Sequence, residues 1–220
     1  MNITNGRKIN YYIIYRQNSC NRSTKLDWKL TQLCSRAKVG KKENIVATTI
    51  TEITDCFEYF FSSLYRREFV KTLRLNECSE RELLPLVRCY LLGWFADNVS
   101  PEVKSKLPGT VSGHGYIDFV IDDVAVEFAV RKPTAARSNV SATVNSTEVK
   151  KLMKHDGKAL LVLFDFSDTP YSEEQIESFR NWPSLGRGNH RKSAFNVVYF
   201  FVEKRRPLAL GKITKNIRIT

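Results

Sequence analysis

Apolar side chains in the N-terminal third of the chain recur at helical spacing. In the segment ITEITDCFEYFFSSLYRREFVKTL, one stripe consists of Ile53, Phe57, Phe60, Phe61 and Leu64. This spacing predicts one long helix, whose aromatic stripe is more typical of a core than of a base-stacking surface. A leucine stripe over residues 26–33 predicts a shorter helix, and residues 9–15 are typical of a short strand. We therefore expect residues 1–74 to form an N-terminal, mostly helical region.

From residue 75 onward the apolar pattern alternates between helical and strand periods. A helix is predicted in SERELLPLVRCYLLGWF, where Ser79 and Glu82 stand at the two positions of a capping box. The elements that follow are two strands in residues 114–122 and 123–131, a helix in NSTEVKKLMKH, a strand in ALLVLFDF, a helix in SEEQIESFRNW and a strand in FNVVYFFVE. This order predicts an α/β domain over residues 75–220, with a mixed β-sheet flanked by helices.

The two adjacent strands meet at Asp122 and Asp123, and taking these two residues as the turn predicts a two-residue hairpin. The resulting register places Asp118 opposite Glu127, with Cβ atoms about 4.5–5.5 Å apart, while the other face of the hairpin is apolar. Like charges directly opposite are destabilising, so something must offset the repulsion. Either a divalent cation such as Mg²⁺ does so, or each acid has a Lys or Arg partner on an exposed sheet face.

A third carboxylate, Glu80, favours the metal site. On its helix, Glu80 begins the apolar stripe that continues through Leu84, Val87 and Leu91, so its carboxylate can lean over the sheet edge. The alternative is that Glu80 only complements the positive end of the helix dipole. We favour the site role, and we assign Glu82 to capping.

The composition limits the class of protein. With 42% hydrophobic and 26% charged residues, the chain is neither disordered nor collagen-like. A net charge of +12 is typical of proteins that meet phosphate. The five cysteines form no CxxC pair, which argues against a structural zinc site and favours free thiols in a reducing compartment. No signal-peptide pattern and no apolar run near the roughly 20 residues of a membrane span occur, so we expect a cytoplasmic, intracellular protein with no membrane partner.

The order of the helix with Glu80, the hairpin with Asp118 and Glu127, a helix and a buried strand resembles the PD-(D/E)xK nuclease superfamily, over residues of about 77 to 203. The resemblance implies a restriction-endonuclease-like fold and a metal-dependent DNA endonuclease of the restriction, repair or defence type. It also implies that Asp118 and Glu127 hold Mg²⁺, for which Mn²⁺ can substitute, and that Glu80 completes the site. In many members a Lys or Gln of the following helix also points at the site; the candidates here are Lys150, Lys151 and Lys154.

This sequence departs from the family motif at Ala129, where the family has a lysine two residues after the glutamate. Position 129 shares a face with Glu127, so a lysine there would reach the metal and the attacking water. Three explanations are open. The lysine has migrated, to Arg131 or to the 146–155 helix; the chain is a natural nuclease-like protein that only binds; or a lysine was replaced by alanine to inactivate the protein. We favour the third, because the rest of the motif is intact, and we then expect the chain as written to be nearly inactive.

Basic residues outside the motif are candidates for contacts with nucleic acid. They are Arg131, Lys132, Arg137, Lys150, Lys151, Arg187, His190, Arg191 and Lys192. The expected partner is DNA, with RNA as an alternative, and double-strand cutting would need two active sites, which suggests a homodimer. Two rival functions remain: a non-catalytic nucleic-acid-binding module on the same fold, and a subunit whose basic surface meets an acidic protein partner.

Overall fold

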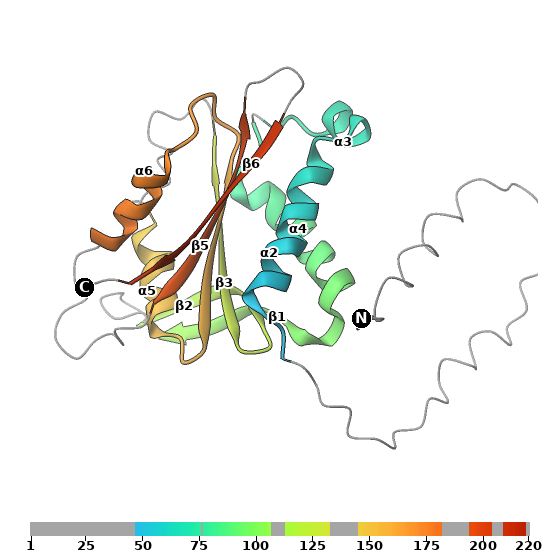
Figure 1. Cartoon of the computed structure of the whole chain (residues 1–220). Coiled ribbons are helices and arrows are strands. Elements are labelled where there is room, and N and C mark those ends of the chain that lie inside the picture. The colour runs from blue at the N-terminus through green and yellow to red at the C-terminus, as the bar shows by residue number, and fades with distance from the viewer. Residues whose placement is uncertain are drawn as a thin grey trace, which may run out of the picture. The chain divides into compact units, whose positions relative to one another are not determined.

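A mixed β-sheet lies at the centre of the protein (Figure 1). The computed structural model describes residues 47–75, 77–106, 113–132, 145–181, 194–203 and 209–218. These residues fall within one compact unit, which begins at Val46. In spatial order, the strands are β1 (Val99–Lys106), β2 (His114–Ile121), β3 (Val124–Arg131), β4 (Lys158–Asp165), β5 (Phe195–Glu203) and β6 (Ala209–Ile217).

Helices cover both faces of the sheet, with α2 and α4 on one face and α5 and α6 on the other (Figure 1). The helices are α2 (Ile50–Leu64), α3 (Arg67–Thr72), α4 (Glu80–Phe95), α5 (Ser146–Lys154) and α6 (Glu173–Glu177), with short 3₁₀ turns η3 (Ala96–Asn98) and η4 (Ser178–Asn181). The predicted α/β architecture, a mixed sheet flanked by helices, is therefore confirmed.

The central strands β3, β4 and β5 run parallel, and β1, β2 and β6 are joined to them by antiparallel pairs. Parallel strands covered on both faces read as continuous apolar runs, and β4 is buried from Ala159 to Asp165. The edge strands β1 and β6 were not predicted from the sequence. The sequence of β1, VSPEVKSK, contains Pro101 and mostly polar residues, so it lacks the apolar pattern that predicts a strand. Strand β6 alternates between half-buried and exposed positions, as an edge strand can.

The β2–β3 hairpin has the predicted two-residue turn. Ile121 pairs with Val124, which leaves Asp122 and Asp123 as the turn residues. Asp122 adopts a positive φ of 52°, a conformation that aspartate tolerates better than most residues. Its carboxylate accepts hydrogen bonds from the backbone N–H, at 2.9 Å, and from the hydroxyl of Thr48, just before α2. The turn is thus tied to the start of the first described helix.

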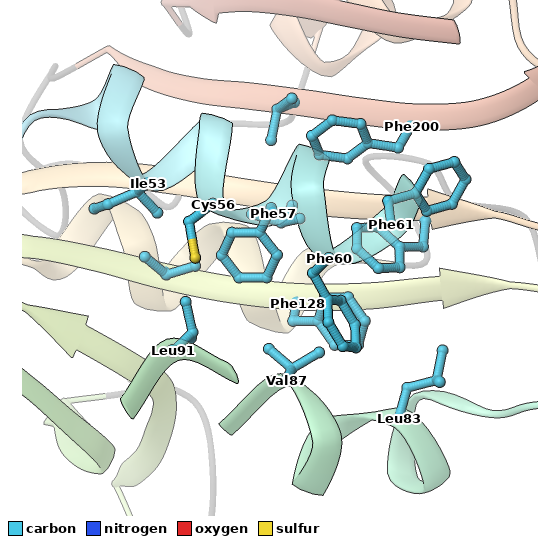
Figure 2. Packing of buried hydrophobic residues seen from close by; sticks show 14 of the residues in the cluster. Ile53, Cys56, Phe57, Phe60, Phe61, Leu83, Val87, Leu91, Phe128 and Phe200 are labelled. Carbon is cyan, nitrogen blue, oxygen red and sulfur yellow. The ribbon is translucent and has the colours of Figure 1, made fainter. Parts of the chain in front are cut away.

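One hydrophobic core lies between the sheet and helices α2 and α4. Figure 2 shows Ile53, Phe57 and Phe61 of α2 in this cluster, together with Phe128 of β3 and Phe200 of β5. Phe61 is central, because its ring packs edge-on against Phe164 at 4.8 Å and stacks with Phe200 at 5.6 Å. The aromatic stripe predicted from the sequence therefore forms core.

The helix predicted through residue 73 is interrupted. Helix α2 ends at Leu64 and α3 begins at Arg67, so the prediction of one long helix was wrong. The reason is packing, since Leu64 is the last buried residue of the stripe whereas α3 buries none of its residues. Without a buried face, nothing holds the chain along the direction of α2.

Helix α2 belongs to the same compact unit as the sheet, although the sequence analysis placed it in an N-terminal region that ends at residue 74. Residues 1–46, with the strand and the helix expected there, lie outside the described part of the chain. Among the helices that the structure describes, none is long and apolar enough to cross a membrane.

Candidate functional site

The predicted register of the hairpin is correct for the pairs next to the turn, but the strands are no longer paired at Asp118 and Glu127. Phe119 pairs with Val126 and Val120 with Ala125, but the backbone pairing of β2 with β3 ends there. Asp118 uses its side chain instead, and its Oδ2 accepts the backbone N–H of Phe128 at 2.8 Å. The carboxylate takes the place that a β2 carbonyl would have in a continuing ladder. The predicted pairing of Asp118 with Glu127 is therefore replaced by two diverging strands.

The opening between the strands is filled by Lys151 of α5. Its Nζ lies 2.6 Å from Oε2 of Glu127 and also donates, at 2.6 Å, to the carbonyl of Tyr116 on β2. The ammonium thus bridges β2 and β3 where they separate. The Glu127 residue is only 1% exposed, and its second oxygen, Oε1, has no hydrogen-bond partner among the described residues. One carboxylate oxygen is therefore buried and available for a cation or a proton.

The carboxyl groups of this region lie close enough to shift one another's titration. Burial raises the pKa of Glu127 to about 9, the Asp118 carboxylate adds to the rise, and the Lys151 ammonium opposes it. Burial also raises the pKa of Asp118, against the hydrogen bond from Phe128 and the charge of Lys151, which lower it. The cluster is thus short of positive charge.

Glu80 joins this cluster from the other face of the sheet. It is the first residue of α4, and the residue as a whole is exposed. The pKa of its carboxyl is nevertheless raised to about 7, mainly by loss of water around the carboxyl and secondly by repulsion from Asp118 and Glu148. The three acids singled out from the sequence therefore interact electrostatically. Glu82 has the expected capping role, since its carboxylate accepts the backbone N–H of Ser79 at 2.6 Å.

Two further acids, Glu102 and Glu148, were missed by the sequence analysis. On β1, the pairs Pro101–Phe119 and Val103–Ile117 flank Glu102, whose φ is +53° and whose carboxylate meets Arg88 at 2.7 Å. Glu102 could not be placed near the other acids because β1, the strand that carries it, was not predicted from the sequence. Glu148 precedes Lys151 by one helical turn, and this spacing could have indicated it. Both carboxylates raise the pKa of Asp118.

Ala129, at the position of the family lysine, is packed in an apolar environment. The residue is 4% exposed and belongs to the cluster of Ile117, Val149 and Leu152 beneath α5. The three explanations for alanine at this position stay predictions, and Lys151 of α5 is the lysine whose ammonium contacts Glu127.

Arg131, the other candidate for the migrated charge, is engaged elsewhere. Its Nη1 lies 2.8 Å from Oδ2 of the buried Asp165, and its guanidinium lies over the ring of Tyr171 at 4.1 Å. The same nitrogen donates to the Ser167 hydroxyl at 2.9 Å and to the Thr169 carbonyl at 2.7 Å. Arg131 therefore fastens the ends of β3 and β4 rather than approaching Glu127.

The remaining basic candidates fall into two groups. Lys132 follows β3 and Lys150 lies on α5, and both are half-buried. The other predicted contacts, Arg137, Arg187, His190, Arg191 and Lys192, lie outside the described residues.

The candidate ligands for a metal ion are the carboxylates of Asp118, Glu127 and Glu80. Within the described ranges, no group of three or more His, Cys, Asp or Glu side chains is arranged to hold one. The buried Oε1 of Glu127, beside Asp118, instead fits a cation held by one or two carboxylates, which is how Mg²⁺ is usually bound with substrate oxygens as further ligands. No protein-family model matches the chain, and neither does any curated protein or solved structure.

Proposed function

We propose that the protein is a Mg²⁺-dependent nuclease of the restriction-endonuclease-like fold that hydrolyses phosphodiester bonds of DNA. The observation that carries the proposal is the buried carboxylate of Glu127, which has one oxygen on the Lys151 ammonium and the other without a partner, at the point where two strands separate. A metal ion held by carboxylates and an ammonium beside it are two means by which phosphodiester hydrolysis is catalysed, and Glu80 interacts with the strand acid Asp118 through its charge.

Each group has a role in this proposal. Asp118 and Glu127 would hold the metal ion, which when bound supplies positive charge to the phosphate oxygens and lowers the pKa of water. Lys151 stabilises the negative charge that develops on the phosphoryl group. Glu80, with a pKa of about 7, is suited to take the proton of the attacking water near neutral pH. The water oxygen bonds to phosphorus, the bond to the leaving oxygen breaks, and that oxygen takes a proton from solvent.

The net charge of +12 supports an anionic polymer as the substrate. One observation favours a second candidate, a nucleic-acid-binding module without catalysis: the described residues hold no preformed three-carboxylate metal group. In that case Lys151 would serve only to neutralise Glu127.

A cleavage assay separates the two. Plasmid and oligonucleotide DNA are incubated with the unmodified chain and Mg²⁺ or Mn²⁺, and with Asp118→Asn and Glu127→Gln. The matched control is Asp123→Asn in the same hairpin, whose carboxylate is half exposed and lies 3.5 Å from Lys158. We expect the site variants to lose about 10²–10³ in rate and the control to keep its rate. Salt-dependent binding without cleavage by the unmodified chain would favour the binding module.

A further inference from the structure

The β1–β2 pair extends as a two-stranded arm beyond the point where β2 stops pairing with β3, which itself stays paired with β4. Pairing of β2 with β3 ends at Phe119, whereas pairing of β1 with β2 continues through Lys104–Tyr116 to the ends of both strands. Ile117 anchors this arm in the apolar cluster that contains Val149 of α5. In Figure 1 the arm is drawn in green, beside α5. The arm therefore begins at the carboxylate cluster and is held in place there.

The arm presents an exposed aromatic ring and an exposed cation side by side. Tyr116 is 60% exposed, and its cross-strand partner Lys104 is also exposed. Cross-strand partners share a face of a ribbon, so the ring and the ammonium lie on the same side. Tyr59 on α2 is equally exposed but stacks on Trp94 at 5.6 Å, whereas within the described chain the ring of Tyr116 stacks on no other aromatic ring.

The backbone of Tyr116 is part of the candidate site. Its carbonyl accepts the hydrogen bond from Lys151 that also reaches Glu127, so its backbone is fixed by the same ammonium. It precedes Asp118 by two residues, which corresponds to about 6.6 Å along a strand. A phosphate bound between Asp118 and Lys151 would bring an adjoining nucleotide to this ring.

We propose that Tyr116, together with Lys104, is a platform on which an unpaired base of the substrate stacks beside the scissile phosphate. The inference rests on the proposed function for the location of that phosphate. An exposed ring flanked by a cation is the usual means of holding single-stranded nucleic acid, whereas the bases of an intact duplex already stack on each other. The substrate class is therefore single-stranded or locally unpaired nucleic acid.

Binding measurements on the full chain test this inference. Fluorescence anisotropy is recorded with a labelled single-stranded oligonucleotide and with its duplex, in Ca²⁺, which takes the same oxygen ligands as Mg²⁺. The variants are Tyr116→Ala, Tyr116→Phe and, as the matched control, Tyr59→Ala. We expect Tyr116→Ala to weaken single-strand binding by roughly 5- to 150-fold, while Tyr116→Phe and Tyr59→Ala stay within about 2-fold of the unmodified chain.

The outcomes distinguish this inference from the proposed function. Equal loss on duplex and single strand, or no difference between Tyr116→Ala and Tyr59→Ala, would overturn the stacking platform even if the chain cleaves DNA. A selective single-strand effect of Tyr116→Ala supports the platform. Should that effect appear in a chain that cleaves nothing under any metal, the proposed catalysis fails, and Tyr116 is then the stacking platform of a non-catalytic binding module. Thermal unfolding of each variant checks that the fold is intact.

Discussion

The ammonium of Lys151 lies 2.6 Å from the carboxylate of Glu127, although the two residues come from different elements, α5 and β3. Both side chains are nearly inaccessible, and burial of two charges is repaid only when the geometry is good and further hydrogen bonds are made. Lys151 makes one more, to the Tyr116 carbonyl, whereas Oε1 of Glu127 makes none within the described residues. The pair is therefore incomplete on the side of the acid, where we propose that a metal ion binds.

Replacement of Lys151 by methionine should abolish most of the cleavage. The side-chain volume is similar but the charge is lost, so we expect kcat to fall by about 10²–10³ with a smaller change in KM. Lys71→Met, at an exposed position of α3 outside the proposed site, is the control and should cleave like the unmodified chain. Unfolding is measured in parallel, because Lys151→Met also removes the hydrogen bonds to Glu127 and to the Tyr116 carbonyl, which can destabilise the protein. An active and stable Lys151→Met variant would remove Lys151 from the proposed site.

Introduction of the family lysine by Ala129→Lys should not raise the cleavage rate. Ala129 is 4% exposed in an apolar cluster, and Lys151 already supplies an ammonium to Glu127. We expect overpacking and a second buried charge to lower the free energy of unfolding of the variant by about 1–3 kcal/mol, as measured by denaturant unfolding. Cleavage is compared in Mg²⁺ with that of the unmodified chain. A strong gain in rate would instead support the interpretation that a lysine at position 129 had been replaced.

The hairpin could be read from the sequence because its signals are local. Asp122 and Asp123 fix a two-residue turn, and the turn fixes the register of the pairs next to it. Divergence of the strands after Phe119 could not be read, since it depends on the Asp118 side chain accepting the N–H of Phe128. When a side chain replaces a backbone group in the hydrogen bonding between strands, the alternation of apolar and polar residues does not change, so the sequence pattern does not show it.

The acids of the proposed site could be predicted from the sequence, whereas the lysine that contacts them could not be assigned. Asp118 and Glu127 follow from strand alternation, and Glu80 from its position at the head of an apolar stripe. Three lysines, Lys150, Lys151 and Lys154, were equivalent candidates, because helical spacing does not say how α5 is rotated on the sheet. Packing of α5 decides this, by burying Lys151 over Glu127.

Protein stability should fall as the pH rises from about 5 to 9 in the absence of metal. In the unfolded chain Glu127 titrates near an ordinary value of about 4.3, whereas in the folded protein its pKa is about 9. Between these values the unfolded state has lost a proton that the folded state retains, so a higher pH favours unfolding. Glu80, with a pKa of about 7, adds to the effect over the lower part of this window.

Thermal unfolding across this pH range is the corresponding measurement. We expect Tm to decline toward pH 9 in the unmodified chain, the decline to be shallower in Glu127→Gln, and Mg²⁺ to raise Tm most at high pH if it binds the folded state. Glu77→Gln, an exposed carboxylate 3.5 Å from Arg74, should leave the pH profile unchanged. A profile that is equally steep in Glu127→Gln would show that Glu127 does not hold the proton.

Cys56 should resist thiol reagents for as long as α2 remains packed on the sheet. The residue is fully buried and burial raises the pKa of its thiol to about 12, so little reactive thiolate is present at neutral pH. Cys89 on the exposed side of α4 is the internal reference and should react quickly. Labelling is followed by mass spectrometry in a chain with Cys20→Ser and Cys34→Ser. Equal rates at Cys56 and Cys89 would mean that α2 detaches readily from the sheet.

Replacement of Arg131 should affect stability rather than nucleic-acid binding. Its guanidinium is used by Asp165, Ser167 and Thr169, and Asp165 is fully buried. Arg131→Ala leaves that carboxylate without its ion-pair partner, so we expect a loss of about 3–5 kcal/mol in the free energy of unfolding. The control is Arg180→Ala, whose exposed ion pair with Glu177 should change stability by less than about 0.5 kcal/mol. DNA binding by Arg131→Ala is then measured against salt concentration well below its Tm. An unchanged salt dependence is expected, whereas a slope reduced by about one would make Arg131 a phosphate contact after all.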